Sequence, residues 1–239
     1  MSFGLPDAVR VCLFDMDGVL TKTEKVHAKA WKQMFDDYLR QRAQSTGEPF
    51  KPFDERSDYD EYVDGKPREE GVRSFLASRG IELDAETIHA LGERKNQLVQ
   101  ALIEHDGVQV YDDTIAYLDA VQQAGLPCAV VSSSTNTHDV LQAAGLAGRF
   151  DAVIDGVVAA REHLHGKPAP DTFLAGARAL HVEPAGAAVY EDAVAGVEAG
   201  HAGHFGLVVG VDRAGQADEL RAHGADVVVS DLRDLLRQP

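Results

Sequence analysis

Two aspartates stand directly after an apolar run near the start of the chain, in the stretch VCLFDMDGVL (11–20). Side chains two positions apart on an extended strand point to the same face, so Asp15 and Asp17 would crowd together at the end of a hydrophobic element. Two like charges about 4 Å apart repel by roughly 4 kcal/mol at an effective dielectric constant near 20. A cation is therefore expected to hold them there.

Polar residues follow other apolar runs in the same way. Ser132 stands in VVSSSTN, Lys167 in HGKPAPD, and Glu191 with Asp192 in AVYEDAVAG. Taken alone, each of these short patterns is typical of a helix cap or a turn. Ligands of parallel sheets bind outside the carboxyl ends of the strands, and four such features in order indicate that they converge on one site.

The residue types at this site suggest phosphoryl chemistry. Lys167 alone cannot offset four acidic groups, whereas Mg²⁺ takes one or two carboxylates together with waters and phosphate oxygens. A carboxylate beside the metal can attack a phosphoryl group, and a second carboxylate can act as acid and base. A hydroxyl and a lysine can hold the transferring oxygens.

These residues need a parallel sheet to position them, and the second half of the chain predicts one. Continuous apolar runs, typical of strands buried on both faces, alternate with helical spacing. The expected strands are 9–15, 126–132, 151–155, 187–192, 206–211 and 225–230, and helices are expected at 135–145, 170–181 and 193–203. The pattern predicts a doubly wound, Rossmann-like α/β domain.

Residues 23–105 interrupt that alternation. Three segments here have helical spacing and no strand signal, and the polar, proline-bearing segment 45–67 is expected to be a loop. We therefore predict an all-helical domain, 23–105, inserted after the first strand of a core formed by 1–22 and 106–239.

Composition limits the partners. The 239 residues carry a formal net charge of −16, which argues against nucleic acid or an anionic membrane as partner. The first ten residues lack the pattern of a secretory signal. Cys12 and Cys128 stand in apolar runs and are expected to be buried thiols of a reducing compartment. A cytoplasmic protein is expected.

Four motifs, DMDGVLT, VVSSSTN, GKPAPDTF and YEDAVAGVEAG, resemble the ordered motifs of the haloacid dehalogenase superfamily of phosphotransferases. The resemblance implies that Asp15 is the nucleophile and Asp17 the general acid/base. It makes Ser132 and Lys167 the phosphoryl-binding pair. It also implies a Mg²⁺ site formed by Asp15, by Asp17 through its backbone carbonyl, and by Asp192 with Glu191 close by. The inserted helices are similar to the mobile cap of that superfamily.

Within the superfamily, TKTEKVHAKAW, VDGKPREEGV and ERKNQL resemble the β-phosphoglucomutase-like subfamily. The resemblance implies interconversion of β-D-glucose 1-phosphate and D-glucose 6-phosphate through the 1,6-bisphosphate, and Arg68 as the group that grips the second phosphate. A planar guanidinium suits a bidentate phosphate contact. The implied substrate-binding residues are Thr23, His27, Trp31, Arg68, Lys95, Ser134 and Asn136.

Two other functions stay open on the sequence. One is a phosphatase on the same scaffold, in which water takes the phosphoryl group from Asp15. The other is a phospho-acceptor signalling module, against which the inserted domain and Asp17 both argue. A monomer acting on a small phosphorylated sugar is expected.

Overall fold

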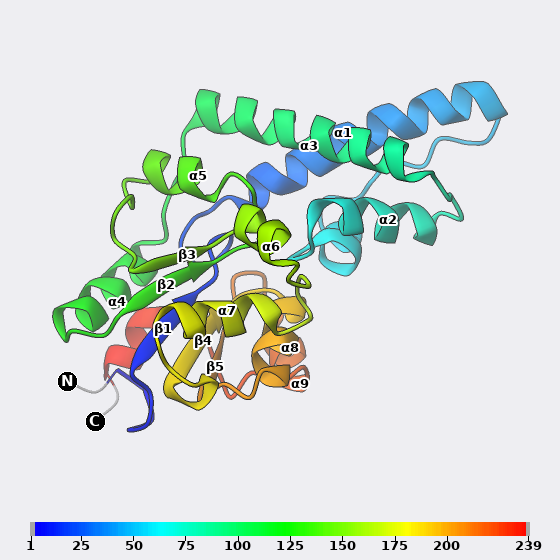
Figure 1. Ribbon diagram of the computed structural model, residues 1–239. Helices are drawn as coiled ribbons and strands as arrows, with labels where there is room; N and C mark the ends of the chain where they lie inside the picture. Colours follow the sequence, from blue (N-terminus) through cyan, green and yellow to red (C-terminus); the bar gives the residue numbers. More distant parts are fainter. Residues whose placement is uncertain (1–2, 238–239) are drawn as a thin grey trace. The chain divides into compact units, whose positions relative to one another are not determined.

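The computed structural model describes residues 3–237 and divides the chain into two compact units (Figure 1). An α/β unit contains the chain up to Lys22 and from Val108 onward, and a helical unit contains Thr23–Gly107. Among the described residues, no helix has the length and hydropathy required to cross a bilayer.

The α/β unit is built on a six-stranded parallel sheet with the order β3-β2-β1-β4-β5-β6. Its strands are β1 (Val11–Phe14), β2 (Cys128–Val131), β3 (Ala152–Ile154), β4 (Ala187–Glu191), β5 (Leu207–Val211) and β6 (Val227–Val229). This is the doubly wound order in which the direction of winding reverses between β1 and β4. The predicted fold class and all six strands are confirmed, each strand one to three residues shorter than its apolar run.

Helices connect these strands. They are α4 (Asp112–Gln123), α5 (Thr137–Ala143), α6 (Gly156–Glu162), α7 (Asp171–Ala179), α8 (Val194–Ala202) and α9 (Ala217–Ala222), with 3₁₀ turns η2 (Pro184–Gly186) and η3 (Leu232–Arg237). The three predicted helices correspond to α5, α7 and α8.

The side chains of β1 alternate between two cores. Val11 and Leu13 pack in a cluster with residues of α7 and α8. Phe14 points to the other face, where its ring stacks on Tyr190 of β4 at 4.5 Å and meets Tyr117 of α4 at 6.5 Å. Because both faces are buried, the strand is apolar throughout, and the polar residues begin only where it ends.

The two cysteines are neighbours across the sheet. Cys12 and Cys128 pair in register on β1 and β2, and both are buried free thiols. Cys12 Sγ lies 3.7 Å from the Tyr190 hydroxyl, which lies 2.7 Å from the Tyr117 hydroxyl. The polar atoms of this apolar layer therefore satisfy one another.

The helical unit contains α1 (Glu24–Thr46), α2 (Arg68–Ser78) and α3 (Ala85–Asp106). Its separate core is aromatic: the Phe35 ring lies 5.2 Å from Phe53 and 4.2 Å from Phe75. The loop prediction for 45–67 is wrong in part. Tyr59–Val63 forms a π-helical turn (η1), because Tyr59 and Val63 are buried in this core.

The chain leaves and re-enters the α/β unit through two adjacent segments. Thr21 forms an antiparallel bridge with Val110, and the Lys22 N–H donates to the Gln109 carbonyl at 2.8 Å. The Tyr111 N–H donates to the Leu20 carbonyl at 3.1 Å. These hydrogen bonds form a linker pair, residues 20–22 with 109–111.

Candidate active site

The carboxylates of the α/β unit meet at the point where the strand order reverses. Asp15 follows β1, Glu191 ends β4, and Asp192 follows it. One oxygen from each of these three carboxylates lies within 4.8 Å of the others. Ligands of doubly wound sheets bind at this position, because the connections on either side turn away and leave a crevice.

Lys167 holds two of these acids together. Its Nζ forms an ion pair with Asp15 and lies 2.5 Å from Glu191 Oε1, and the side chain is only 1% exposed. It also donates to the Val131 carbonyl at 3.4 Å, at the end of β2. Burial alone would lower the pKa of Lys167, but the attraction of Asp15 and Glu191 outweighs it and raises that pKa above its usual value. The lysine is therefore charged when the site operates.

Asp15 lies under opposing influences. Burial is the largest and raises the pKa of its carboxyl well above the ordinary value, Lys167 lowers it, and the charges of Glu191 and Asp17 raise it further. Three converging carboxylates face a single lysine, so the cluster has an excess of negative charge. Hard oxygen ligands with excess negative charge fit a divalent cation.

Two glycines make room for the acids. Gly18 has φ +83°, and a Cβ there would collide with the Asp192 carboxylate. A Cβ on Gly196, in the first turn of α8, would collide with the Glu191 carboxylate. Glu191 Oε2 also accepts the Ala193 N–H at 2.9 Å. Glycine at 18 and 196 is thus needed for the carboxylates to lie where they do.

The serine loop after β2 is held by its own hydroxyl groups. Ser132 Oγ accepts the Ser134 N–H at 3.1 Å, and Ser134 Oγ accepts the Asn136 N–H at 3.1 Å. The Ser132 N–H donates to the Ile154 carbonyl of β3 at 2.9 Å. Ser132 and Asn136 are buried and Ser134 is half-buried. The loop therefore has a defined shape next to the residue that Lys167 contacts.

In the helical unit, three of the predicted residues form one cluster. Lys95 Nζ lies 2.8 Å from His27 Nδ1 and 4.9 Å from the centre of the Trp31 ring. An ammonium group only donates, so Nδ1 accepts and the imidazole proton lies on Nε2. Thr23, which immediately precedes α1, is buried one turn before His27, and its carbonyl accepts the His27 N–H at 2.8 Å.

Arg68 belongs to a second pair in this unit. At the first position of α2, its guanidinium forms an ion pair with Glu93 of α3. Gly92 permits this approach, because a Cβ there would lie 3.3 Å from the Arg68 side chain. The structure therefore gathers the predicted residues into the acid cluster, the serine loop, the Lys95 cluster and the Arg68 pair. The Asp17 carboxylate does not belong to the three-carboxylate group found among residues 3–237, although its charge acts on Asp15.

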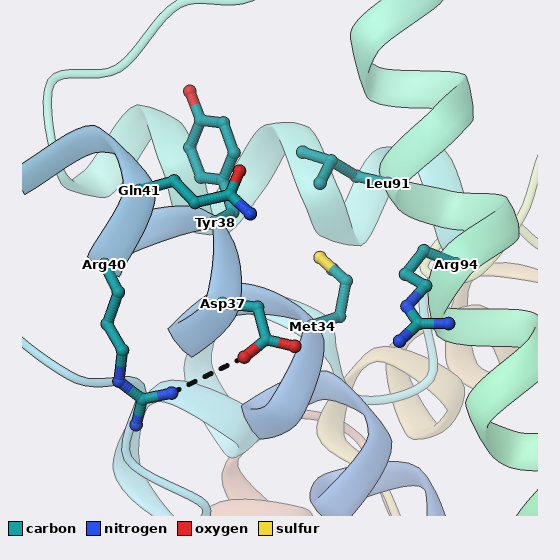
Figure 2. Close-up of a pocket in the computed structure, with 7 residues that line it drawn as sticks. All are labelled: Met34, Asp37, Tyr38, Arg40, Gln41, Leu91 and Arg94. Atoms are coloured by element: carbon teal, nitrogen blue, oxygen red, sulfur yellow. Dashed lines mark hydrogen bonds and ion pairs between the residues drawn. The ribbon is translucent and has the colours of Figure 1, made fainter. Parts of the chain in front are cut away.

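A pocket of about 400 Å³ opens between α1 and α3, further along α1 than Trp31 (Figure 2). It is lined by Met34, Asp37, Tyr38, Arg40, Gln41, Leu91 and Arg94. Arg40 lies 3.5 Å from Asp37, and Arg94 directly precedes Lys95 in α3. The pocket contains none of the predicted site residues.

Comparison with known proteins gives the family. A family model for haloacid dehalogenase-like hydrolases matches residues 9–204, which include all four motifs of the α/β unit. The chain belongs to the haloacid dehalogenase-like family. A β-phosphoglucomutase of Mycobacterium tuberculosis (strain CDC 1551 / Oshkosh) is 56% identical over 245 residues, covering 98% of this chain and 94% of that protein.

Two further relatives agree with this membership. A β-phosphoglucomutase of Bacillus subtilis is 34% identical over 95% of this chain and 92% of its own length. A crystal structure of a β-phosphoglucomutase from Clostridium difficile matches with a TM-score of 0.76 and 26% identity, covering 95% of this chain and 93% of that one. The haloacid dehalogenase-like fold thus extends over nearly the whole chain.

One residue of this haloacid dehalogenase-like site was missed by the sequence analysis. The Lys167 ammonium lies 4.7 Å from the centre of the buried Phe173 ring, so an aromatic face borders the charged group. The signal was available, since Phe173 ends the motif GKPAPDTF that begins beside the lysine. Its role was not evident, because a single phenylalanine in a helix also reads as ordinary core.

Proposed function

We propose that this chain is a Mg²⁺-dependent β-phosphoglucomutase, interconverting β-D-glucose 1-phosphate and D-glucose 6-phosphate. One observation carries the proposal: three carboxylates and a buried lysine converge where the sheet reverses, in a chain 56% identical to a β-phosphoglucomutase along 98% of its length.

We assign the covalent step to Asp15. The cycle begins with Asp15 carrying a phosphoryl group as an aspartyl-phosphate. Asp17 removes the proton from the C6 hydroxyl of β-glucose 1-phosphate, whose oxygen attacks the phosphorus, so that the bond between phosphorus and Asp15 breaks and the 1,6-bisphosphate forms. The free Asp15 carboxylate then attacks the phosphorus at C1 of the bisphosphate, and the bond between that phosphorus and the sugar oxygen breaks. Asp17 returns its proton to the departing oxygen, glucose 6-phosphate leaves, and the aspartyl-phosphate is regenerated.

Lys167 and Ser132 hold the phosphoryl group during transfer. The lysine is buried, charged and fixed by two acids, so it needs no reorganisation to meet developing negative charge. Glu191 contacts both Lys167 and the Ala193 N–H, which supports a role in positioning the lysine as well as in the metal site.

Mg²⁺ is the cofactor we propose, because a hard cation matches the oxygen donors of Asp15, Glu191 and Asp192 together with the backbone carbonyl of Asp17. When bound, it supplies charge neutralisation to the phosphoryl oxygens. The excess negative charge of the cluster supports this assignment.

We assign substrate binding to seven residues of both units: Thr23, His27, Trp31, Arg68, Lys95, Ser134 and Asn136. A bisphosphate requires two anion sites, and the helical unit offers Lys95 and Arg68 for the phosphate that is not transferred. Lys95 is already held by His27 and Trp31, which fix the position of its ammonium group. We further propose that the helical unit acts as a cap domain over the α/β unit.

A product assay tests the proposal. Purified protein is given β-glucose 1-phosphate, Mg²⁺ and a trace of the 1,6-bisphosphate, and glucose 6-phosphate and inorganic phosphate are followed together by ³¹P NMR. Formation of glucose 6-phosphate without release of phosphate is expected, and Asp15→Asn is the inactive control. Release of phosphate without glucose 6-phosphate would identify a phosphatase instead.

A further inference from the structure

The loop between β5 and α9, residues 212–216, binds the backbone on both sides of the acid cluster. Arg213 Nε donates to the Gly18 carbonyl at 3.2 Å, and Gln216 Nε2 donates to the Asp192 carbonyl at 2.8 Å. We propose that Arg213 and Gln216 are positioning residues that fix the two turns carrying the metal-binding oxygens. The proposal rests on the proposed function where turnover is concerned, and on the geometry alone where metal binding is concerned.

Arg213 connects several segments that are distant in sequence. Besides Gly18, its guanidinium contacts the Ser230 carbonyl at 3.2 Å and the Asp113 carboxylate at 3.1 Å. It lies 3.8 Å from the centre of the Tyr111 ring, which belongs to the linker pair. Only 12% of the side chain is exposed. Because the planar Arg213 guanidinium contacts several partners at once, these contacts fix its orientation.

A second connection runs from Arg213 to the same turn. Its Nη2 donates to Thr114 Oγ1 at 2.9 Å, and Thr114 Oγ1 donates to the Val19 carbonyl at 2.7 Å. Arg213 therefore holds Gly18 directly and Val19 through Thr114. The Gly18 N–H also donates to the Thr21 carbonyl at 2.8 Å. The turn after Asp17 is therefore held both by Arg213 and by a hydrogen bond of its own backbone.

Gln216 is placed by the shape of its own loop. Asp212 Oδ1 accepts the Gly215 N–H at 2.7 Å and the Gln216 N–H at 2.8 Å, and Gly215 has φ +81°. These bonds fold the loop back so that the half-buried Gln216 amide reaches the Asp192 carbonyl. One loop thus constrains the turn after β1 and the turn after β4 together.

The glycine geometry explains why this constraint matters. Gly18 and the Asp192 carboxylate lie so close that even a methyl group at Gly18 would collide. A small shift of either turn therefore changes the separation of the oxygens that we assign to Mg²⁺. Mutation of residues that hydrogen-bond to metal ligands and orient them commonly lowers metal affinity or activity by about 10–100-fold.

The test uses the full-length protein in two measurements. The first is the Mg²⁺ concentration at half-maximal increase in melting temperature, without substrate. The second is turnover of β-glucose 1-phosphate as a function of Mg²⁺ and of substrate. Variants Arg213→Met, Arg213→Lys and Gln216→Ala are compared with Arg221→Met and Gln142→Ala, which alter exposed side chains on α9 and α5.

For Arg213→Met and Gln216→Ala we expect about a tenfold higher half-saturating Mg²⁺ concentration and a fall in kcat, with KM for the sugar phosphate changed less than about twofold. Arg213→Lys should restore little of the Mg²⁺ affinity or of kcat. A lysine ammonium can pair with Asp113 but cannot make the other contacts of the planar guanidinium. The two control variants should behave as wild type.

Three results would overturn the proposal: unchanged Mg²⁺ dependence in Gln216→Ala, full rescue by lysine at 213, or losses confined to KM. If Arg213→Met fails to fold, Gln216→Ala and Arg213→Lys decide the question. If wild type forms no glucose 6-phosphate, the proposed function fails, while the substrate-free Mg²⁺ measurement still tests the two positioning residues.

Discussion

At the scale of single residues, Lys167 determines the character of the acid cluster. It contacts Asp15 and Glu191 at once, yet one positive charge cannot balance three carboxylates. The raised pKa of Asp15 shows that burial and repulsion together exceed the attraction of the lysine. The ionised form of Asp15 is therefore unfavourable in the folded protein, and a bound cation would offset that cost.

Asp15→Asn tests this balance. The folded-state pKa of Asp15 is raised above its usual value of 3.8, so the ionised form destabilises the native state at every pH above that raised pKa. We expect the asparagine variant to lose all turnover but to melt at a higher temperature than wild type without Mg²⁺ near neutral pH. Each kcal/mol should appear as roughly 2–4 °C.

The melting difference should shrink as the pH falls through the raised pKa, because the wild-type carboxyl then becomes neutral as well. Asp139→Asn, an exposed change on α5, is the matched control and should leave the melting temperature unaltered. A lower melting temperature for Asp15→Asn would show that the ion pair with Lys167 stabilises more than burial destabilises.

Arg68 supports a prediction about the second phosphate. Arg68→Ala should reduce turnover of β-glucose 1-phosphate by about tenfold or more, since a charge-assisted contact contributes roughly 1.5–3 kcal/mol. Hydrolysis of a small monophosphate, which has no second phosphate, should change little. Arg73→Ala, an exposed position on the same helix, is the control. Equal losses on both substrates would contradict the assigned role.

At the scale of elements, the segment around Phe53, which follows α1 and has little regular structure, is held by hydrogen bonds to side chains of α1. Asp36 Oδ1 accepts the Phe53 N–H at 2.8 Å, and Lys32 donates to the Phe53 carbonyl at 2.8 Å. Asp36 also lies 3.1 Å from Lys32 and 3.6 Å from Arg40. The Phe53 ring is thereby kept in the aromatic core of the helical unit.

Neighbouring aspartates on α1 allow this role to be measured. Asp36→Ala leaves the buried Phe53 N–H without its acceptor and removes the carboxylate that pairs with Lys32, so we expect a loss of about 1–3 kcal/mol in the free energy of unfolding. Asp37→Ala removes an exposed carboxylate and should cost less than about 1 kcal/mol. Urea unfolding of both variants gives the two values, and similar losses would show that the contacts of Asp36 add no stability.

The elements also show what the sequence could predict. Strands buried on both faces are continuous apolar runs, so all six were predictable. Tyr59–Val63 was not, because a polar segment with prolines gave no periodic signal. Its buried residues Tyr59 and Val63 belong to a core built with residues distant in sequence. α6 buries none of its side chains, so it has no apolar stripe to reveal it.

For the site, the sequence predicted the residues that lie at the ends of strands but not the contacts between them. Residues that follow strand ends were found, because topology alone brings them to one edge. Arg213 reaches Gly18 across 195 positions and Glu191 reaches Lys167 across 24, and no local pattern marks either contact. Contacts that depend on the tertiary path of the chain require the structure.

At the scale of the whole molecule, the acids that we assign to Mg²⁺ lie only in the α/β unit. Mg²⁺ at about 100 times its Kd stabilises the form that binds it by about 2.7 kcal/mol. Hydrogen exchange followed by mass spectrometry should therefore show slower exchange in β1 and β4 when Mg²⁺ replaces EDTA at matched ionic strength, with α2 unchanged. Uniform slowing in both units would contradict the assignment.

The linker pair implies that the inserted helical unit can be replaced as a whole. Lys22 and Gln109 are hydrogen-bonded neighbours, so eighty-odd residues depart from and return to a single place on the α/β unit. Segments whose ends lie together can be inserted or replaced without disturbing the host. A chimaera carrying another relative's helices between these two residues would keep the acids, the lysine and the serine loop of this chain, while the substrate-binding residues that we assign to the helical unit would all be exchanged together.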